Sequence, residues 1–175
     1  MSTVLTREEA LDVGANPTGS IRKGNMSLAL IRTQIATVIK AATSLANTVY
    51  EYKRYSADFD SYKSLFKENE IIHTWDIERP HVSKDQHGGH GGQEDSVHTF
   101  MVRGFYRLND SLASEKTFND IVEDVIQAFI EDIQLGATAT TIEFPIEADI
   151  TNVMFAHVLC HKAEITINVQ ERRIF

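Results

Sequence analysis

The stretch that decides the fold is Ala163-Glu-Ile-Thr-Ile-Asn-Val-Gln170, close to the end of the sequence. Apolar and polar side chains alternate along it, so every second residue points to the same side of an extended chain. A period of two is typical of a β-strand that buries one face. The pattern predicts a strand over residues 157–171. Its other face carries Thr166, Asn168 and Gln170, an uncharged row that would suit a sheet edge or an interface.

Two segments have the spacing of amphipathic helices. The first covers residues 26–45 and the second residues 115–135, for which Ser114 is a suitable N-cap and Gly136 a suitable stop. The helix stripes and the strand alternation together predict a core of Ile31, Ile35, Val38, Trp75, Phe118, Val122, Val125, Phe129, Ile165 and Ile167.

The remaining pattern predicts one domain. Further strands are expected at residues 47–55, 70–79, 97–108 and 138–144, with a short helix or turn at residues 59–67. Pro80 should end the second of these strands, because proline cannot donate to a ladder. Residues 81–96 are interpreted as a flexible polar loop within a hairpin, and residues 1–25 as an arm before a domain of residues 26–175. The order predicts an α+β fold, a mostly antiparallel β-sheet with two main helices packed on one face.

Length and composition limit the class of protein. The chain has 175 residues, 42% of them hydrophobic, which suits one globular domain with a sizeable core. The net charge of −8 disfavours a general nucleic-acid binder, because such proteins neutralise phosphates with lysine and arginine. No apolar stretch has the length of a membrane span or the features of a signal peptide. We therefore expect no membrane partner, and assembly in a reducing cytoplasm.

The densest cluster of chemically reactive side chains is His157-Val-Leu-Cys160-His161. A strand would place Cys160 on the opposite side from both histidines, whereas a zinc site needs convergent ligands and a nucleophile needs its base beside it. The sequence also has no glycine-rich phosphate-binding run and no Gly-x-Ser-x-Gly elbow. We therefore expect a protein that is not an enzyme.

Three further histidines, His81, His87 and His90, lie in the predicted glycine-rich loop. They could bind a divalent metal, but glycine supplies conformational freedom instead of a preorganised site. A solvated loop tip, or a contact with another protein, is the favoured interpretation. We expect these histidines to be dispensable for folding, and we expect neither a metal nor a cofactor.

Acidic residues dominate the polar side of the second predicted helix. They are Glu115, Asp120, Glu123, Asp124, Glu131 and Asp132, with only Lys116 opposing them. A solvated helix face explains such a row without any function. The functional alternative is a surface that faces DNA without holding it, because like charge repels the phosphate backbone.

Several stretches resemble one family, the tail terminator or tail completion proteins of long-tailed bacteriophages (minor tail protein U-like). They are the opening helix of residues 27–45 leading into residues 47–55, Val97-His-Thr-Phe-Met-Val-Arg-Gly-Phe-Tyr-Arg107, Phe118-Asn-Asp-Ile-Val-Glu-Asp-Val-Ile-Gln-Ala-Phe129, and the final strands ending in Ile165-Thr-Ile-Asn-Val-Gln-Glu171. The similarity covers most of residues 26–171 and lies in the order of the elements and the general pattern of their residues.

The resemblance implies a structural virion protein. Such proteins form a ring, usually a hexamer, that caps the tail tube, joins it to the head and leaves a channel for double-stranded DNA, which passes without specific binding. The implied partners are other copies of the chain, the tail-tube protein and a head–tail connector or adaptor protein in the virion neck. On this interpretation the acidic row borders the channel, and Arg172, Arg173, His87 and His90 contact partners. A head-completion, adaptor or tail-tube protein is the alternative, and a small metal-binding or enzymatic cytoplasmic protein ranks behind it.

Overall fold

The computed structural model describes residues 28–45, 47–54, 59–68, 71–87 and 92–174, and the predicted arm and His90 lie outside them. The fold is α+β, as predicted. Its elements in chain order are α1 (Leu28–Thr43), β1 (Val49–Tyr50), α2 (Phe59–Leu65), β2 (Lys67–Glu68), β3 (Ile71–His87), β4 (Gln93–Arg107), the 3-10 turn η1 (Asp110–Leu112), α3 (Ser114–Glu131), β5 (Thr141–Phe155) and β6 (Val158–Ile174).

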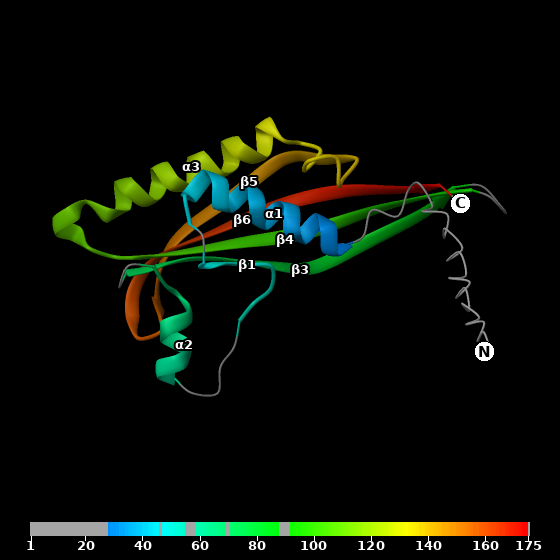
Figure 1. The fold of residues 1–175 in the computed structure, drawn as a ribbon. Coiled ribbons are helices and arrows are strands. Elements are labelled where there is room, and N and C mark those ends of the chain that lie inside the picture. The colour runs from blue at the N-terminus through cyan, green and yellow to red at the C-terminus, as the bar shows by residue number, and fades with distance from the viewer. Residues whose placement is uncertain (1–27, 46, 55–58, 69–70, 88–91, 175) are drawn as a thin grey trace, which may run out of the picture.

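The sheet has the order β1-β3-β4-β6-β5, with β2 attached to β3. The four long strands are antiparallel to their neighbours, whereas the two-residue β1 pairs parallel with β3 at Trp75 and Asp76. In Figure 1, α1 and α3 lie together over one face of the sheet and α2 lies on the other side. The predicted arrangement of two main helices on one face of a mostly antiparallel sheet is therefore confirmed.

The main core lies between these two helices and the sheet. Along β6 the residues from Ala163 to Val169 alternate between buried and half-buried, because every second side chain points toward the helices. All the side chains predicted as the core are at most 8% exposed: Ile31, Ile35, Val38, Trp75, Phe118, Val122, Val125, Phe129, Ile165 and Ile167. The apolar faces of the two helices and of β6 thus pack against each other in one layer.

A second, smaller core lies on the opposite face. Phe66, Ile72, Phe105 and Cys160 are buried together there, where the chain after α2 packs against the sheet. As a result β3 is buried on both faces near its start, where Ile72, Thr74 and Asp76 are buried as well as Trp75 and Ile77. Simple alternation could not predict this second layer, because alternation assumes that one face of a strand meets water.

The predicted flexible loop at residues 81–96 is wrong in its extent. β3 continues to His87 and β4 begins at Gln93, and they stay paired apart from an irregularity between Glu78 and His81. Pairing does not require apolar side chains here, because cross-strand polar contacts replace them: Lys84 Nζ lies 3.0 Å from Glu94 Oε1. The two strands form one long hairpin that extends past α1 (Figure 1).

The uncharged row of the last strand had suggested a sheet edge or an interface. The strand does not lie at a sheet edge. β6 lies between β4 and β5, and β5 is the outer strand. β5 also extends to Phe155, well past the predicted end at residue 144, and it joins β6 through a turn at Ala156 and His157, whose φ angles are 47° and 58°. The sequence prediction ended this strand at residue 144 because Pro145 follows, although the strand continues through residues 147–152, all of which are exposed.

The predicted ends of the second helix need correction. Ala113, with a φ of 50°, is the N-cap of α3, and Ser114 is its first helical residue. The helix ends at Glu131, and the chain then turns at Gly136, where φ is +60° and the N–H donates to the carboxylate of Asp132. The predicted strand at residues 47–55 shrinks to the two residues of β1. None of the helices in the described ranges is long and apolar enough to span a membrane.

Candidate functional site

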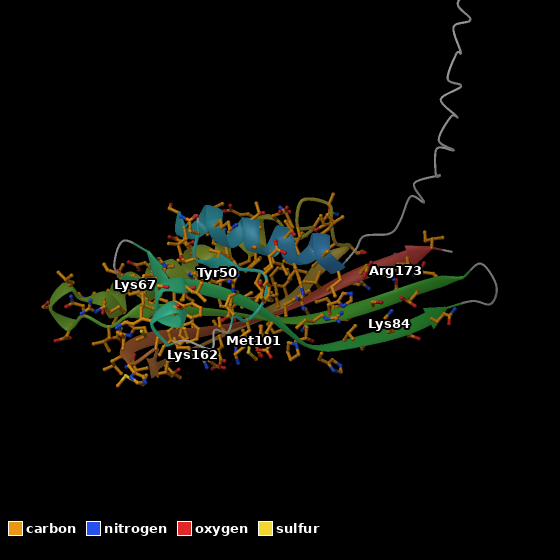
Figure 2. All side chains as sticks on the ribbon, turned by 60° about the horizontal axis from the view of Figure 1, so that its bottom comes forward. Tyr50, Lys67, Lys84, Met101, Lys162 and Arg173 are labelled. Carbon is orange, nitrogen blue, oxygen red and sulfur yellow. The ribbon has the colours of Figure 1, made fainter. Side chains whose placement is uncertain are left out.

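The sheet face opposite α1 and α3 is polar along the middle of β4 and β6. Partners in an antiparallel ladder share a face, so Thr99 lies beside Asn168 and Met101 beside Thr166. These side chains are half-buried, and the Thr99 hydroxyl donates to Asn168 Oδ1 at 2.8 Å. Figure 2 turns this face forward, with Met101 labelled near the centre of the sheet. We call it the open face, because no described helix packs on its middle part.

Acidic side chains outnumber cations on the strands of the open face. By ladder register the acids are Asp76, Glu78, Asp85, Asp95, Glu143, Glu147, Asp149 and Glu164, and the cations are Lys67, Arg103, Arg107, Lys162 and Arg172. Lys162 Nζ lies 2.7 Å from Glu164 Oε1, and Arg172 Nε lies 2.9 Å from Asp95 Oδ1, so cations on this face are partly neutralised. The open face is therefore a negatively charged surface with an uncharged centre.

One ion pair on this face is buried. The Arg103 guanidinium donates from Nε and Nη2 to Asp76 Oδ1, at 2.8 and 2.6 Å, and its Nη1 lies 3.0 Å from Glu78 Oε2. Burial raises the pKa of Asp76, and the charge of Arg103 and its hydrogen bond oppose that rise. The pair fixes β3 against β4 beside the second core, which gives it a structural role.

Within the described residues, β5 and the outer part of β3 each have a stretch of edge without a partner strand. β5 pairs with β6 on one side; on its other side the Ile142 N–H donates to Ile133 O at 2.7 Å near its start, and no described strand pairs with the rest. β3 pairs on its outer side with β1 and β2 only near its start, so its outer edge from Ile77 to Lys84 has no strand partner in the described part of the chain. Such edges are templates for pairing with another chain. Pro80 and the charged residues along both strands are typical of protected edges.

The predicted acidic row does form an exposed surface of α3. Glu115, Asp120, Glu123, Asp124 and Glu131 are exposed and Asp132 is half-buried. The last two also serve the helix end: Glu131 accepts from Gln127 and Asp132 accepts from the Gly136 N–H. The row lies on the helix layer, on the other side of the sheet from the open face.

The two arginines predicted as partner contacts have partners within the chain. Arg172 is exposed and pairs with Asp95, a hydrogen bond that raises the pKa of the guanidinium. Arg173 donates to Glu171, a carboxylate that is fully buried. The two side chains point to opposite faces of β6, so they cannot form one basic patch.

Glu171 belongs to a buried polar chain that sequence reasoning missed. Arg79 Nη1 lies 3.1 Å from His98 Nδ1, and His98 Nε2 lies 3.0 Å from Glu171 Oε2. A guanidinium can only donate, so His98 Nδ1 accepts from Arg79, and His98 Nε2 carries the proton and donates a hydrogen bond to Glu171. No local signal reveals this contact, because His98 and Glu171 are 73 residues apart in the sequence.

Of the three histidines of the predicted loop, only His81 has a side chain in the described part of the structure. His81 is exposed on β3, and the backbone of His87 pairs with Gln93 at the end of the hairpin. The expectation that they are dispensable for folding stays a prediction. Across the residues that the structure describes, no group of three or more His, Cys, Asp or Glu side chains is arranged to hold a metal ion.

The predicted separation of Cys160 from His161 is confirmed. Cys160 lies in the second core, where burial raises the pKa of its thiol to about 11. His161 points to the opposite face, toward α3, and His157 lies in the turn before β6. A thiol of this kind is mostly protonated near neutral pH and is a poor nucleophile.

No protein-family model matches this chain, and no curated protein matches it.

Proposed function

We propose that this protein is a ring-forming structural protein of a tailed bacteriophage, which caps the tail tube, joins it to the head and leaves a channel for DNA. The observation that carries the proposal is the pair of open edges at the two sides of one sheet. The resemblance in element order, from the opening helix to the last strand, supports the same assignment.

The strand directions fit a head-to-tail contact between copies. β3, β4, β6 and β5 alternate in direction across the sheet, so β5 is antiparallel to β3. The β3 of a neighbouring copy, placed beside β5, would therefore continue the alternation without a break. A contact between two different edges can repeat around an axis and close a ring. Regular stretches for such a ladder lie at residues 81–84 of β3 and 147–155 of β5, beyond the irregularities at Glu78–His81 and Glu143–Glu147.

The ring also has a natural inner face. If the sheets of neighbouring copies join, α1 and α3 cover one side of the wall and the open face forms the other. The open face carries an uncharged centre of Thr99, Thr166 and Asn168 among acidic side chains. Such a surface repels phosphates and offers few lysines to hold them, so DNA would slide along it. In this arrangement the acidic row of α3 lies on the outside.

The proposed location is the neck of the virion, and the proposed partners are the tail-tube protein and a connector or adaptor. Electron microscopy of particles assembled without this protein tests the assignment. A terminator predicts overlong tails without heads, because nothing stops growth of the tube. Tails of normal length beside heads that leak DNA would contradict it and favour a head-completion protein. A single copy per neck, found by mass measurement, would contradict the ring itself.

A further inference from the structure

Ser114, His161 and Asn152 form a hydrogen-bonded chain that links three elements. Ser114 is the first residue of α3, His161 lies on β6 and Asn152 on β5. The Ser114 Oγ lies 2.9 Å from His161 Nε2, and His161 Nδ1 lies 2.8 Å from Asn152 Oδ1. Ser114 and His161 are 47 residues apart in the sequence, so only the fold brings them together.

The order of donors in this chain is the order that activates a serine. The amide oxygen of Asn152 can only accept, so His161 Nδ1 carries a proton and donates a hydrogen bond to that oxygen. Nε2 is then the unprotonated nitrogen and accepts from the Ser114 hydroxyl. The Ser114 oxygen also accepts the Asn109 N–H at 2.8 Å, which holds the hydroxyl in place. The imidazole of His161 stacks on the ring of Phe118, with centroids 5.8 Å apart, and this contact fixes its orientation.

The three side chains line one cavity at the start of α3. Its volume is about 230 Å³, and Ser114, Asn152 and His161 are in its wall together with Glu115 and Lys116. α3 is an 18-residue helix, so its first turn carries partial positive charge that would stabilise a developing oxyanion. The residue before the serine, Ala113, has a φ of 50°, an uncommon conformation for alanine. Nucleophile, base and anion-stabilising helix end thus converge on one space.

We propose that Ser114 is a nucleophile and His161 its general base, acting on small carboxylic esters that fit this cavity. The Ser114 oxygen bonds to the ester carbonyl carbon while its proton moves to His161 Nε2. The tetrahedral species collapses, the bond to the alcohol oxygen breaks, and the alcohol leaves with that proton. Water then bonds to the acyl carbon and gives a proton to the same nitrogen. The bond from that carbon to the Ser114 oxygen breaks, the acid leaves, and the proton returns from His161 Nε2 to the Ser114 oxygen. Asn152 is a positioning residue that sets the imidazole tautomer.

This site does not depend on the proposed ring. The experiment incubates the full chain with a small alkyl fluorophosphonate, which reacts as the ester does: an oxygen–phosphorus bond forms, the phosphorus–fluorine bond breaks, and the proton passes to His161. The adduct is located by mass spectrometry of the tryptic peptide 108–116. This peptide also contains Ser111, an exposed serine whose hydroxyl donates to Asn109 Oδ1, so Ser111→Ala is the matched control.

We expect an adduct on Ser114 that the Ser111→Ala variant keeps and the Ser114→Ala variant loses. His161→Gln should slow labelling by about 100-fold or more, since a general base contributes roughly that much. Asn152 is exposed, so its variants should fold; Asn152→Leu should slow labelling, and Asn152→Asp should restore or raise the rate, because a carboxylate enforces the required tautomer. Absence of an adduct on Ser114 in the wild-type protein, or labelling that is equally fast in His161→Gln, would overturn the proposal.

Discussion

Gly104 of β4 lies directly against the ring of Trp75 in β3. The two residues are cross-strand partners, and a Cβ atom at Gly104 would be 2.6 Å from Cη2 of the indole. Trp75 is fully buried, so its ring has little space into which to move. The Trp75 side chain therefore fills the volume that any larger residue at position 104 would need.

Gly104→Ala should destabilise the protein because of this overlap. We expect a loss of roughly 1–3 kcal/mol in the free energy of unfolding, the usual cost of an extra carbon in a packed core, measured by urea denaturation. Adding Trp75→Phe to Gly104→Ala provides the control, because the smaller ring makes room for the methyl group. The two changes should be strongly coupled in a double-mutant cycle. Additive effects would show that the contact is not the cause.

Phe129→Ala should be among the most destabilising truncations of α3. Phe129 is fully buried between α3 and the sheet, so its removal leaves a cavity and should cost roughly 3–5 kcal/mol. The neighbouring Ile130 is 42% exposed and serves as the control. Thermal and urea melts of both variants measure the difference. An unchanged midpoint for Phe129→Ala would mean that the helix presents another face to the sheet.

Single prolines in β5 should separate folding from ring formation. Along an antiparallel strand the N–H groups alternate between the inner and outer sides, so Ile150 and Thr151 point theirs in opposite directions. Of Ile150→Pro and Thr151→Pro, the variant that removes the outward N–H should keep its melting temperature yet fail to assemble on tail tubes. The other should lose a bond to β6 and be less stable. Normal rings from both variants would exclude β5 as a pairing edge.

Two sets of lysine substitutions distinguish which face meets DNA. Thr166→Lys with Gln170→Lys adds charge to the open face, away from the sheet edges, whereas Asp120→Lys, Glu123→Lys and Asp124→Lys together reverse the exposed row of α3. If the open face lines the channel, only the first set should slow DNA ejection, because each lysine adds affinity for phosphate. Both sets should leave assembly intact. The reverse pattern would assign the channel to the acidic row of α3 instead.

His73 should make the protein less stable in mild acid. Burial lowers its pKa from 6.5 to about 4, and its Nε2 has no hydrogen-bond partner in the described part of the chain. Below pH 6.5 His73 takes up a proton in the unfolded chain but stays neutral in the folded protein, so the free energy of unfolding falls as the pH drops toward 4. The expected loss is at most about 3 kcal/mol. His73→Phe should reduce the difference between urea midpoints at pH 7 and pH 4.5; an equal difference would assign the effect to other groups.

The sequence predicted the parts of the fold that carry a strong period. The stripes of α1 and α3 and the alternation of β6 each repeat over many residues, and every core residue named from them is buried. β5 was shortened and the outer half of β3 was interpreted as a loop, because both segments are largely exposed and contain a proline, Pro145 and Pro80. The contacts of His98 with Glu171 and of Ser114 with His161 join distant segments, and no local pattern encodes them. Ser114 was predicted as a helix cap, a role that Ala113 takes instead.

The burial of Cys160 has a practical consequence for labelling chemistry. The sequence has one cysteine, and that side chain is fully buried with a thiol pKa of about 11, so maleimides should react with it very slowly near neutral pH. A cysteine introduced at an exposed position would then be the dominant reactive thiol. Ile174 is such a position, being 74% exposed and paired with Gln93 at the end of the β3–β4 hairpin. A single dye attached there would report on what the hairpin tip touches, without any need to remove the native cysteine.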